Sequence, residues 1–386
     1  MDPKRTTRAT PSRIAMRRRG RDRGPGRAPS LADRPRRGSY RIRWTLAGPR
    51  SGFWLDYRVA RIALVHDIAG VARIQAQLLR EAGHEVDQIP LSELGASLSW
   101  PAKALAIPLR VAAYVPAIGK LKSNRYDIVH IHWLSQGIVG LLLGRPFFAQ
   151  AHGSDLHVNM RNPLVRTVTL SVIEKARTVF YVTPDLPAYA PGFDQKFSYL
   201  PNPIEIDDQA EPPPMKVARA LIFTRLAPVK GVDRIFPAAD RLRGIVELTA
   251  LEWGPLAKEY AQRYGRLVRF VPPVPHGEVG ALLSQFDVVI GQMSAGSLGL
   301  SELEAMAAGR PVITGIDWSL YPKDPPPVIA AADADGIVAA IEKLRHDQGE
   351  LARLSRDGRE WVRRNHGFER HLQLLEAAYF GPGASS

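Results

Sequence analysis

Residues 286–315 read FDVVIGQMSAGSLGLSELEAMAAGRPVITG, and the fold class can be predicted from this stretch. Its β-branched run, Asp287–Ile290, predicts a buried strand that ends at Gly291. A loop rich in Ser and Gly follows, and apolar residues then recur at helical spacing until Gly309-Arg310-Pro311 ends the helix before another strand. This order predicts a parallel α/β sheet. An anionic ligand is expected at the loop, because the unpaired amides and the dipole of the next helix point there.

A second unit of this kind begins at Leu221–Thr224, which predicts a strand. Arg225 stands at the carboxyl end of this strand, and Lys230 stands where the next helix begins. Two cations at such an edge can bind a diphosphate and offset the charge that builds on it as a bond breaks. An Arg and a Lys at this spacing also occur on solvated helix edges, so the prediction depends on the segments that follow in order.

The first half of the chain opens with a βαβ pattern. Val59–Asp67 predicts a buried strand, Arg73–Ala82 a helix and Glu85–Ile89 a second strand. The intervening loop lacks the G-x-G-x-x-G of a dinucleotide site, so this half is not expected to bind NAD.

Histidines stand at two strands of the first half. His130 and His132 share one face of the strand 127–133, which would suit a metal pair. No third ligand has convincing spacing, which favours buried or pocket-edge histidines over a metal site. His152-Gly153-Ser154-Asp155 follows the next strand, and Asp155 is expected either to line a cleft or to cap the following helix.

The stretch LGLSELEAMAAGRPVITG, preceded by Arg225 and Lys230 in the R-x4-K spacing, resembles family 4 glycosyltransferases (GT4, glycosyl transferases group 1). The resemblance implies the GT-B fold, in which two Rossmann-like domains face a cleft. It also implies that both cations bind the diphosphate of a nucleotide sugar and that Glu304 binds the ribose. The family's first glutamate would stand eight residues before Glu304, where this chain has Gly296.

Further site residues follow from the same resemblance. His152 and Asp155 match the H-G-x-D loop, which implies catalytic positions at the reacting centre. The remaining donor-binding positions are the backbone near Gly299 and Leu300, Gly254 after a strand, and Gly70 in the first loop.

The resemblance divides the chain into three parts. Residues 59–205 form an acceptor domain that a C-terminal helix, 366–386, completes, and residues 215–365 form the donor domain. A stiff linker, Glu211–Pro214, joins them. Residues 1–58 hold 17 Lys/Arg and 4 Asp/Glu, which is +13 of the net charge of +14. They are expected to be disordered.

The basic tail has three interpretations: a segment upstream of the true start, a tether to anionic lipid, or a nucleic-acid arm. The last lacks a recognition helix, so nucleic acid is not an expected partner. Leu98–Leu121 is too charged to span a bilayer and is expected either to pack in the core or to lie at a membrane surface. The chain has no cysteine, which permits a location in the reducing cytoplasm, either free or peripheral at the inner face of the membrane.

The expected reaction transfers a hexose or uronic acid from a UDP- or GDP-sugar to a hydroxyl acceptor, such as a cell-surface glycan or glycolipid precursor, with retention. No D-x-D loop is present, so neither a metal nor another cofactor is expected. Two alternatives stay open. One is a protein that only binds a nucleotide sugar or a partner, and the other is a sugar-nucleotide epimerase.

Overall fold

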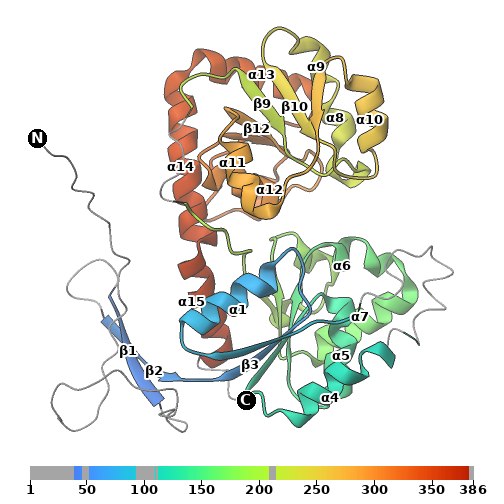
Figure 1. Cartoon of the computed structure of the whole chain (residues 1–386), viewed down its shortest axis with the longest axis vertical. Coiled ribbons are helices and arrows are strands. Elements are labelled where there is room, and N and C mark those ends of the chain that lie inside the picture. The colour runs from blue at the N-terminus through green and yellow to red at the C-terminus, as the bar shows by residue number, and fades with distance from the viewer. Residues whose placement is uncertain (1–38, 46–51, 93–108, 110–111, 208–213, 382–386) are drawn as a thin grey trace, which may run out of the picture.

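The structure is a computed structural model that describes residues 39–45, 52–92, 109, 112–207 and 214–381. Two lobes, each with its own six-stranded sheet, lie one above the other in Figure 1. Every strand pair in both sheets is parallel. The predicted fold class, two parallel sheets flanked by helices, is confirmed.

The sheet of the first lobe has the order β4-β3-β5-β6-β7-β8. Its strands are β3 (Arg61–Val65), β4 (Glu85–Ile89), β5 (Ile128–His132), β6 (Phe148–Ala151), β7 (Thr178–Tyr181) and β8 (Phe197–Tyr199). One face is covered by α1 (Val71–Glu81) and α15 (Phe368–Phe380), and the other by α4 (Val115–Ser123), α5 (Ile138–Leu143) and α7 (Pro163–Lys175). Because helices cover both faces, the central strands are apolar almost without interruption.

The sheet of the second lobe has the order β11-β10-β9-β12-β13-β14. Its strands are β9 (Arg219–Ile222), β10 (Glu247–Leu251), β11 (Val268–Val271), β12 (Val288–Ile290), β13 (Val312–Thr314) and β14 (Ile329–Ala330). One face packs on α8 (Val232–Ile235), α9 (Ala238–Arg241), α10 (Ala257–Tyr264) and α13 (Ala334–His346). The other packs on α11 (Val279–Leu283), α12 (Leu300–Ala307) and α14 (Gln348–His366).

The last two helices join the lobes. α14 runs down the second lobe and ends beside Ile204, whose N–H donates to the His366 carbonyl at 2.8 Å. α15 continues onto the first lobe, where Leu375 and Tyr379 lie in the same core cluster as Ile62 of β3. The chain thus returns to the lobe in which it began (Figure 1).

The expectation of a disordered tail is wrong for two segments. β1 (Ser39–Thr45) and β2 (Gly52–Arg58) form an antiparallel pair. Both segments alternate apolar with polar residues, which is the period of a strand, and the many arginines around them hid this pattern. The other tail residues, 1–38 and 46–51, lie outside the described residues. So do 98–108 and 110–111 of the expected interfacial segment, and 211–213 of the expected linker.

Candidate active site

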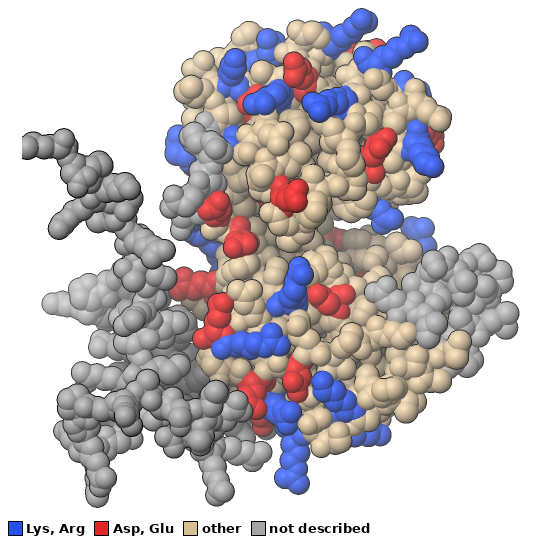
Figure 2. Space-filling model, in the orientation of Figure 1, with Lys and Arg blue, Asp and Glu red and all other residues tan. Residues whose placement is uncertain are grey.

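The carboxyl edges of the two sheets face each other. Asp185 follows β7 of the first lobe, and Ser297 follows β12 of the second. Nε2 of His157 lies 2.7 Å from Oδ2 of Asp185. Burial raises the pKa of Asp185, but the neighbouring His157, Thr183 and Ser297 outweigh it and lower the pKa below its ordinary value. The surface is hollowed between the lobes (Figure 2). Ligands of open α/β sheets bind at such edges, so this interlobe cleft is the candidate active site.

The strand order of the second sheet changes direction between β9 and β12, and the loops that follow these two strands meet there. The Met293 N–H donates to the Lys230 carbonyl at 2.9 Å. Gly231 has a φ of 66°, and a Cβ on it would clash with Ser294 Oγ. Only glycine allows so close an approach. Lys230 is therefore held against the loop 291–299.

Arg225 and Gly254 lie at the same edge. Arg225 follows β9 and is exposed. Gly254 follows β10 with a φ of 121°, and a Cβ on it would stand 2.5 Å from the Leu226 carbonyl oxygen. Within the described part of the chain, the side chains of Arg225 and Lys230 have no hydrogen bond or ion pair, so both cations are free to bind an anion.

One buried side chain organises the loop 291–299. Gln292 donates from Nε2 to the carbonyls of Ser297 at 3.1 Å and Gly315 at 3.0 Å. Its Oε1 accepts from the N–H of Ser294 at 2.8 Å and from that of Ala295. The loop is therefore rigid before any ligand arrives.

Two glutamates of α12 have different roles. Glu302 is buried and accepts from the N–H groups of Gln292 at 2.8 Å and Gly299 at 2.9 Å, so it caps the helix. The Gly299 amide is thus already bonded, which contradicts its expected contact with phosphate. The Leu300 N–H opens the helix and has no intrahelical acceptor.

Glu304 faces away from Glu302 toward the loop after β11. Its side chain is 17% exposed, and its Oε1 lies 3.4 Å from Nδ1 of His276. Burial, with a smaller contribution from Glu302, raises the pKa of Glu304 to about 7. No described contact joins Glu304 to Arg225 or Lys230, so these residues share the edge without touching.

Two strained residues mark the same edge of the first sheet. His66 after β3 and Trp133 after β5 have φ of 66° and 70°, and their rings lie 6.3 Å apart. Non-glycine residues in this left-handed region of φ cluster at functional sites.

Gly70, with a φ of 77°, precedes α1, and a Cβ on it would stand 3.0 Å from Nη2 of Arg73. A guanidinium group therefore lies over the first loop.

The structure contradicts a catalytic role for Asp155. Its side chain is fully buried and accepts from the N–H groups of Gly153 at 2.9 Å, His152 at 3.1 Å and Leu134 at 3.1 Å. Burial raises the pKa of Asp155 in spite of these bonds. The carboxylate joins the loops after β5 and β6 and cannot reach a substrate. His152 is partly exposed, and its Nε2 lies 3.1 Å from Nδ1 of His132.

The sequence reasoning missed Arg73, Asp185 and His276. Each directly follows a strand or opens a helix at the cleft edge, and this position was the signal that could have revealed them. Among the described residues, no three His, Asp or Glu side chains form a group that could hold a metal ion.

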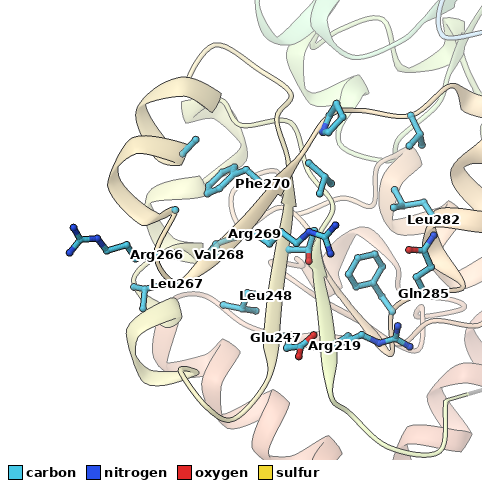
Figure 3. Close-up of a pocket in the computed structure, with 17 residues that line it drawn as sticks. Arg219, Glu247, Leu248, Arg266, Leu267, Val268, Arg269, Phe270, Leu282 and Gln285 are labelled. Carbon is cyan, nitrogen blue, oxygen red and sulfur yellow. The ribbon is translucent and has the colours of Figure 1, made fainter.

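A cavity of about 830 Å³ lies elsewhere, around the outer strands β10 and β11 of the second sheet. Figure 3 shows Arg219, Glu247, Arg269 and Phe270 among the side chains that line it. None of the expected site residues lines this cavity. The interlobe cleft therefore remains the candidate active site.

Comparison with known protein families gives a match that covers most of the second lobe. Residues 203–361 match the family model described as Glycosyl transferases group 1. A comparison with curated protein sequences found no match. The described helices include none that is long and apolar enough to cross a membrane.

Several solved structures share the fold. Sucrose-phosphate synthase from Thermosynechococcus elongatus superposes with a TM-score of 0.67 at 18% identity, covering 85% of this chain and 100% of that one. HepE from Anabaena in complex with UDP-glucose gives 0.65 at 14% identity, covering 82% and 98%. The lipopolysaccharide outer core galactosyltransferase WaaB in its apo form gives 0.59 at 16% identity, covering 83% and 99%. The chain thus shares the GT-B fold of these glycosyltransferases, and residues 203–361, most of its second lobe, are similar to the family model of glycosyl transferases group 1.

Proposed function

We propose that the protein transfers a hexose from a UDP- or GDP-sugar to a hydroxyl acceptor, with retention at the anomeric carbon. One observation carries this proposal: the loop with Arg225 and Lys230 lies against the loop after β12, where the strand order reverses. Two free cations meet a helix N-terminus there, which is the combination that a diphosphate requires.

Each group at the cleft has a proposed role. Arg225 and Lys230 bind the diphosphate and stabilise the charge that it gains as the glycosidic bond breaks. The Leu300 N–H donates to a phosphate or sugar oxygen. Glu304 accepts from the ribose hydroxyls, which requires its ionised form. His152 lies on the opposite wall, where the sugar and the acceptor hydroxyl meet, and Gly70 leaves room for the phosphates.

The proposed donor sugar is a neutral hexose, and a uronic acid is the second candidate. Gly296 stands where the related family has a glutamate, and this absence favours a negatively charged sugar. However, a Cβ on Gly296 would touch Cβ of Asp317 at 3.2 Å, and Asp317 is exposed. This carboxylate beside Gly296 would repel a uronic acid. HepE, which shares the fold, is described with UDP-glucose bound.

The proposed acceptor is a cell-surface glycan or glycolipid precursor. Leu109 and Val115 are 61% and 63% exposed, and the exposed Lys120 and Lys122 stand on the same helix as Val115, α4. Apolar and basic groups together favour contact with an anionic bilayer. Flotation with anionic vesicles, but not with neutral ones, is the expected result, and equal recovery with both would contradict it.

Thermal shift of the full chain with UDP- and GDP-linked hexoses and uronic acids tests the donor site. Arg225→Ala and Lys230→Ala should abolish the shift while the proteins stay folded. Arg243→Ala and Lys216→Ala are matched controls, because both residues precede strands and lie at the opposite edge of the sheet. Unchanged shifts in the first pair would refute the assignment.

A second measurement separates the alternatives. A transferase releases nucleoside diphosphate when an acceptor is present, whereas a binding protein gives only the thermal shift. An epimerase converts the sugar without any acceptor. Equal turnover of uronic acid and neutral hexose donors would contradict the proposed role of Asp317.

A further inference from the structure

A layer of polar side chains lies buried inside the first lobe, between the sheet and the helices α1 and α15. We call it the polar layer, and its members are Gln75, His130, His132, Gln150, His371 and Tyr379. Tyr379 is 2% exposed and the other five are fully buried. Buried polar atoms are almost always hydrogen-bonded, so this layer can be followed bond by bond.

The first hydrogen bonds fix the positions of three protons, the one on Nδ1 of His371 and the two on Nε2 of Gln75. The Pro201 carbonyl can only accept, so Nδ1 of His371, 2.7 Å away, carries the proton. Nε2 of His371 is then an acceptor for Gln75 Nε2 at 3.1 Å. The same Gln75 amide donates to Oε1 of Gln150 at 3.1 Å. Gln75 Oε1 and Gln150 Nε2 are left buried without a partner.

A second chain begins at α15. The hydroxyl of Tyr379 lies 2.6 Å from Nδ1 of His130, its one hydrogen-bond partner among the described residues. A phenol O–H is a stronger donor than a neutral imidazole N–H, so we assign the hydroxyl as the donor. The proton of the neutral His130 ring is therefore on Nε2. This Nε2 and the Nε2 of His132 are buried, and neither has a partner among the residues that the structure describes. The two rings are stacked, with centroids 4.6 Å apart.

Four polar atoms of one connected layer are thus unpaired, and their roles are complementary. Nε2 of Gln150 and Nε2 of His130 are donors, and Oε1 of Gln75 is an acceptor. Across the sheet, His132 is in register with Gln150. If Nε2 of His132 is an acceptor, the set contains two donors and two acceptors, which internal water can satisfy.

We propose that the polar layer binds internal water and that this hydration holds His132 with its proton on Nδ1, so that His152 presents an N–H to the cleft. The Nδ1–H of His132 donates to Nε2 of His152 at 3.1 Å. Burial lowers the pKa of His152 to about 3, so the ring is neutral and has one proton, which must be on Nδ1. This inference rests on the proposed function for the role of His152, but not for its tautomer.

The opposite arrangement is less favourable. A proton on Nε2 of His132 would leave three buried donors facing a single acceptor, Gln75 Oε1, and buried N–H groups without partners are rare. His132 is therefore a positioning residue. It acts through His152, which then offers a donor to an oxygen of the sugar or acceptor.

Long-range ¹H–¹⁵N correlation spectra of the full chain, labelled in the histidine rings, test the tautomers directly. Protons are expected on Nδ1 of His132, His152 and His371 and on Nε2 of His130. A proton on Nε2 of His152 overturns the proposal. A crystal structure in which the four unpaired atoms bond to each other without water overturns it as well. Neither result depends on transferase activity.

Two variants add a functional measurement. His132→Asn retains a donor near the position of Nδ1 and should keep the tautomer of His152 and kcat within about threefold. His132→Phe removes the donor, should mix the tautomers and should lower kcat by about tenfold. His346→Asn, on the surface, is the control. Equal kcat in the Phe and Asn variants, with both folded, contradicts the positioning role.

Discussion

Replacing Asp155 with Ala should destabilise the protein, because this fully buried carboxylate accepts from three backbone N–H groups. The donors belong to Leu134, His152 and Gly153, at 3.1, 3.1 and 2.9 Å. A hydrogen bond to a charged acceptor contributes about 1.5–3 kcal/mol net. Three such bonds set an upper limit near 9 kcal/mol.

The actual loss is smaller, because burying the carboxylate has its own cost, seen in the raised pKa of Asp155. We expect the free energy of unfolding to fall by about 3–5 kcal/mol in Asp155→Ala. Asp155→Asn keeps one oxygen but turns an NH₂ toward an N–H donor, and should lose about 2–3 kcal/mol. Asp194 is an exposed carboxylate of the same lobe, so Asp194→Ala should change the free energy of unfolding by less than about 0.5 kcal/mol.

Urea unfolding, followed in parallel by tryptophan fluorescence and circular dichroism, measures these changes, and agreement of the two signals checks for a single transition. Transfer activity of each variant is measured below its unfolding transition. The reasoning would be refuted if Asp155→Asn lost transfer a hundredfold while keeping the unfolding free energy of the wild type. That result would restore the catalytic role that the H-G-x-D resemblance implied.

Three further predictions concern the second lobe, and a fourth concerns metal dependence. The pKa of Glu304 is raised from 4.5 in the unfolded chain to about 7 in the folded protein. The stability that this group contributes is therefore present below pH 4.5, and about 3 kcal/mol of it is lost as the pH rises through 7. Glu304→Gln should flatten this part of the stability–pH curve, and an unchanged curve would contradict the raised pKa. Nucleotide affinity of the wild type should rise over the same pH range, because ribose binding requires the carboxylate. Gly296→Glu places a side chain at a φ of 71° and against Asp317, so thermal unfolding should show a loss of about 1–2 kcal/mol rather than a gain of activity. Dialysis against EDTA should leave transfer unchanged, and recovery of activity on adding Mg²⁺ to a dialysed sample would count against metal independence.

The fold could be predicted from local patterns. Runs such as Asp287–Ile290 are apolar because both faces of a parallel sheet are covered, and helices recur between them because parallel strands need a crossover. The order of these units, with Arg225 and Lys230 after one strand and Glu304 after another, located the edge at which we propose that the nucleotide binds. Composition misled only at β1 and β2, where arginines masked a two-residue alternation.

The roles of individual side chains could not be predicted from local patterns, because they depend on contacts between separate segments. Asp155 and His152 belong to one motif, yet one is buried under three N–H groups and the other is partly exposed, because the loop after β5 lies over Asp155. The Gly299 amide is occupied by Glu302 from one turn further on.

Periodicity and the order of charged residues along the chain were therefore enough to predict the two sheets and the edge proposed to bind phosphate. The folded molecule alone decided which atoms at that edge are free. A polar group can be satisfied by a hydrogen-bond partner from any part of the sequence, so local patterns do not reveal that partner. Asp185 and Ser297, for example, belong to different lobes and meet only after both sheets have formed.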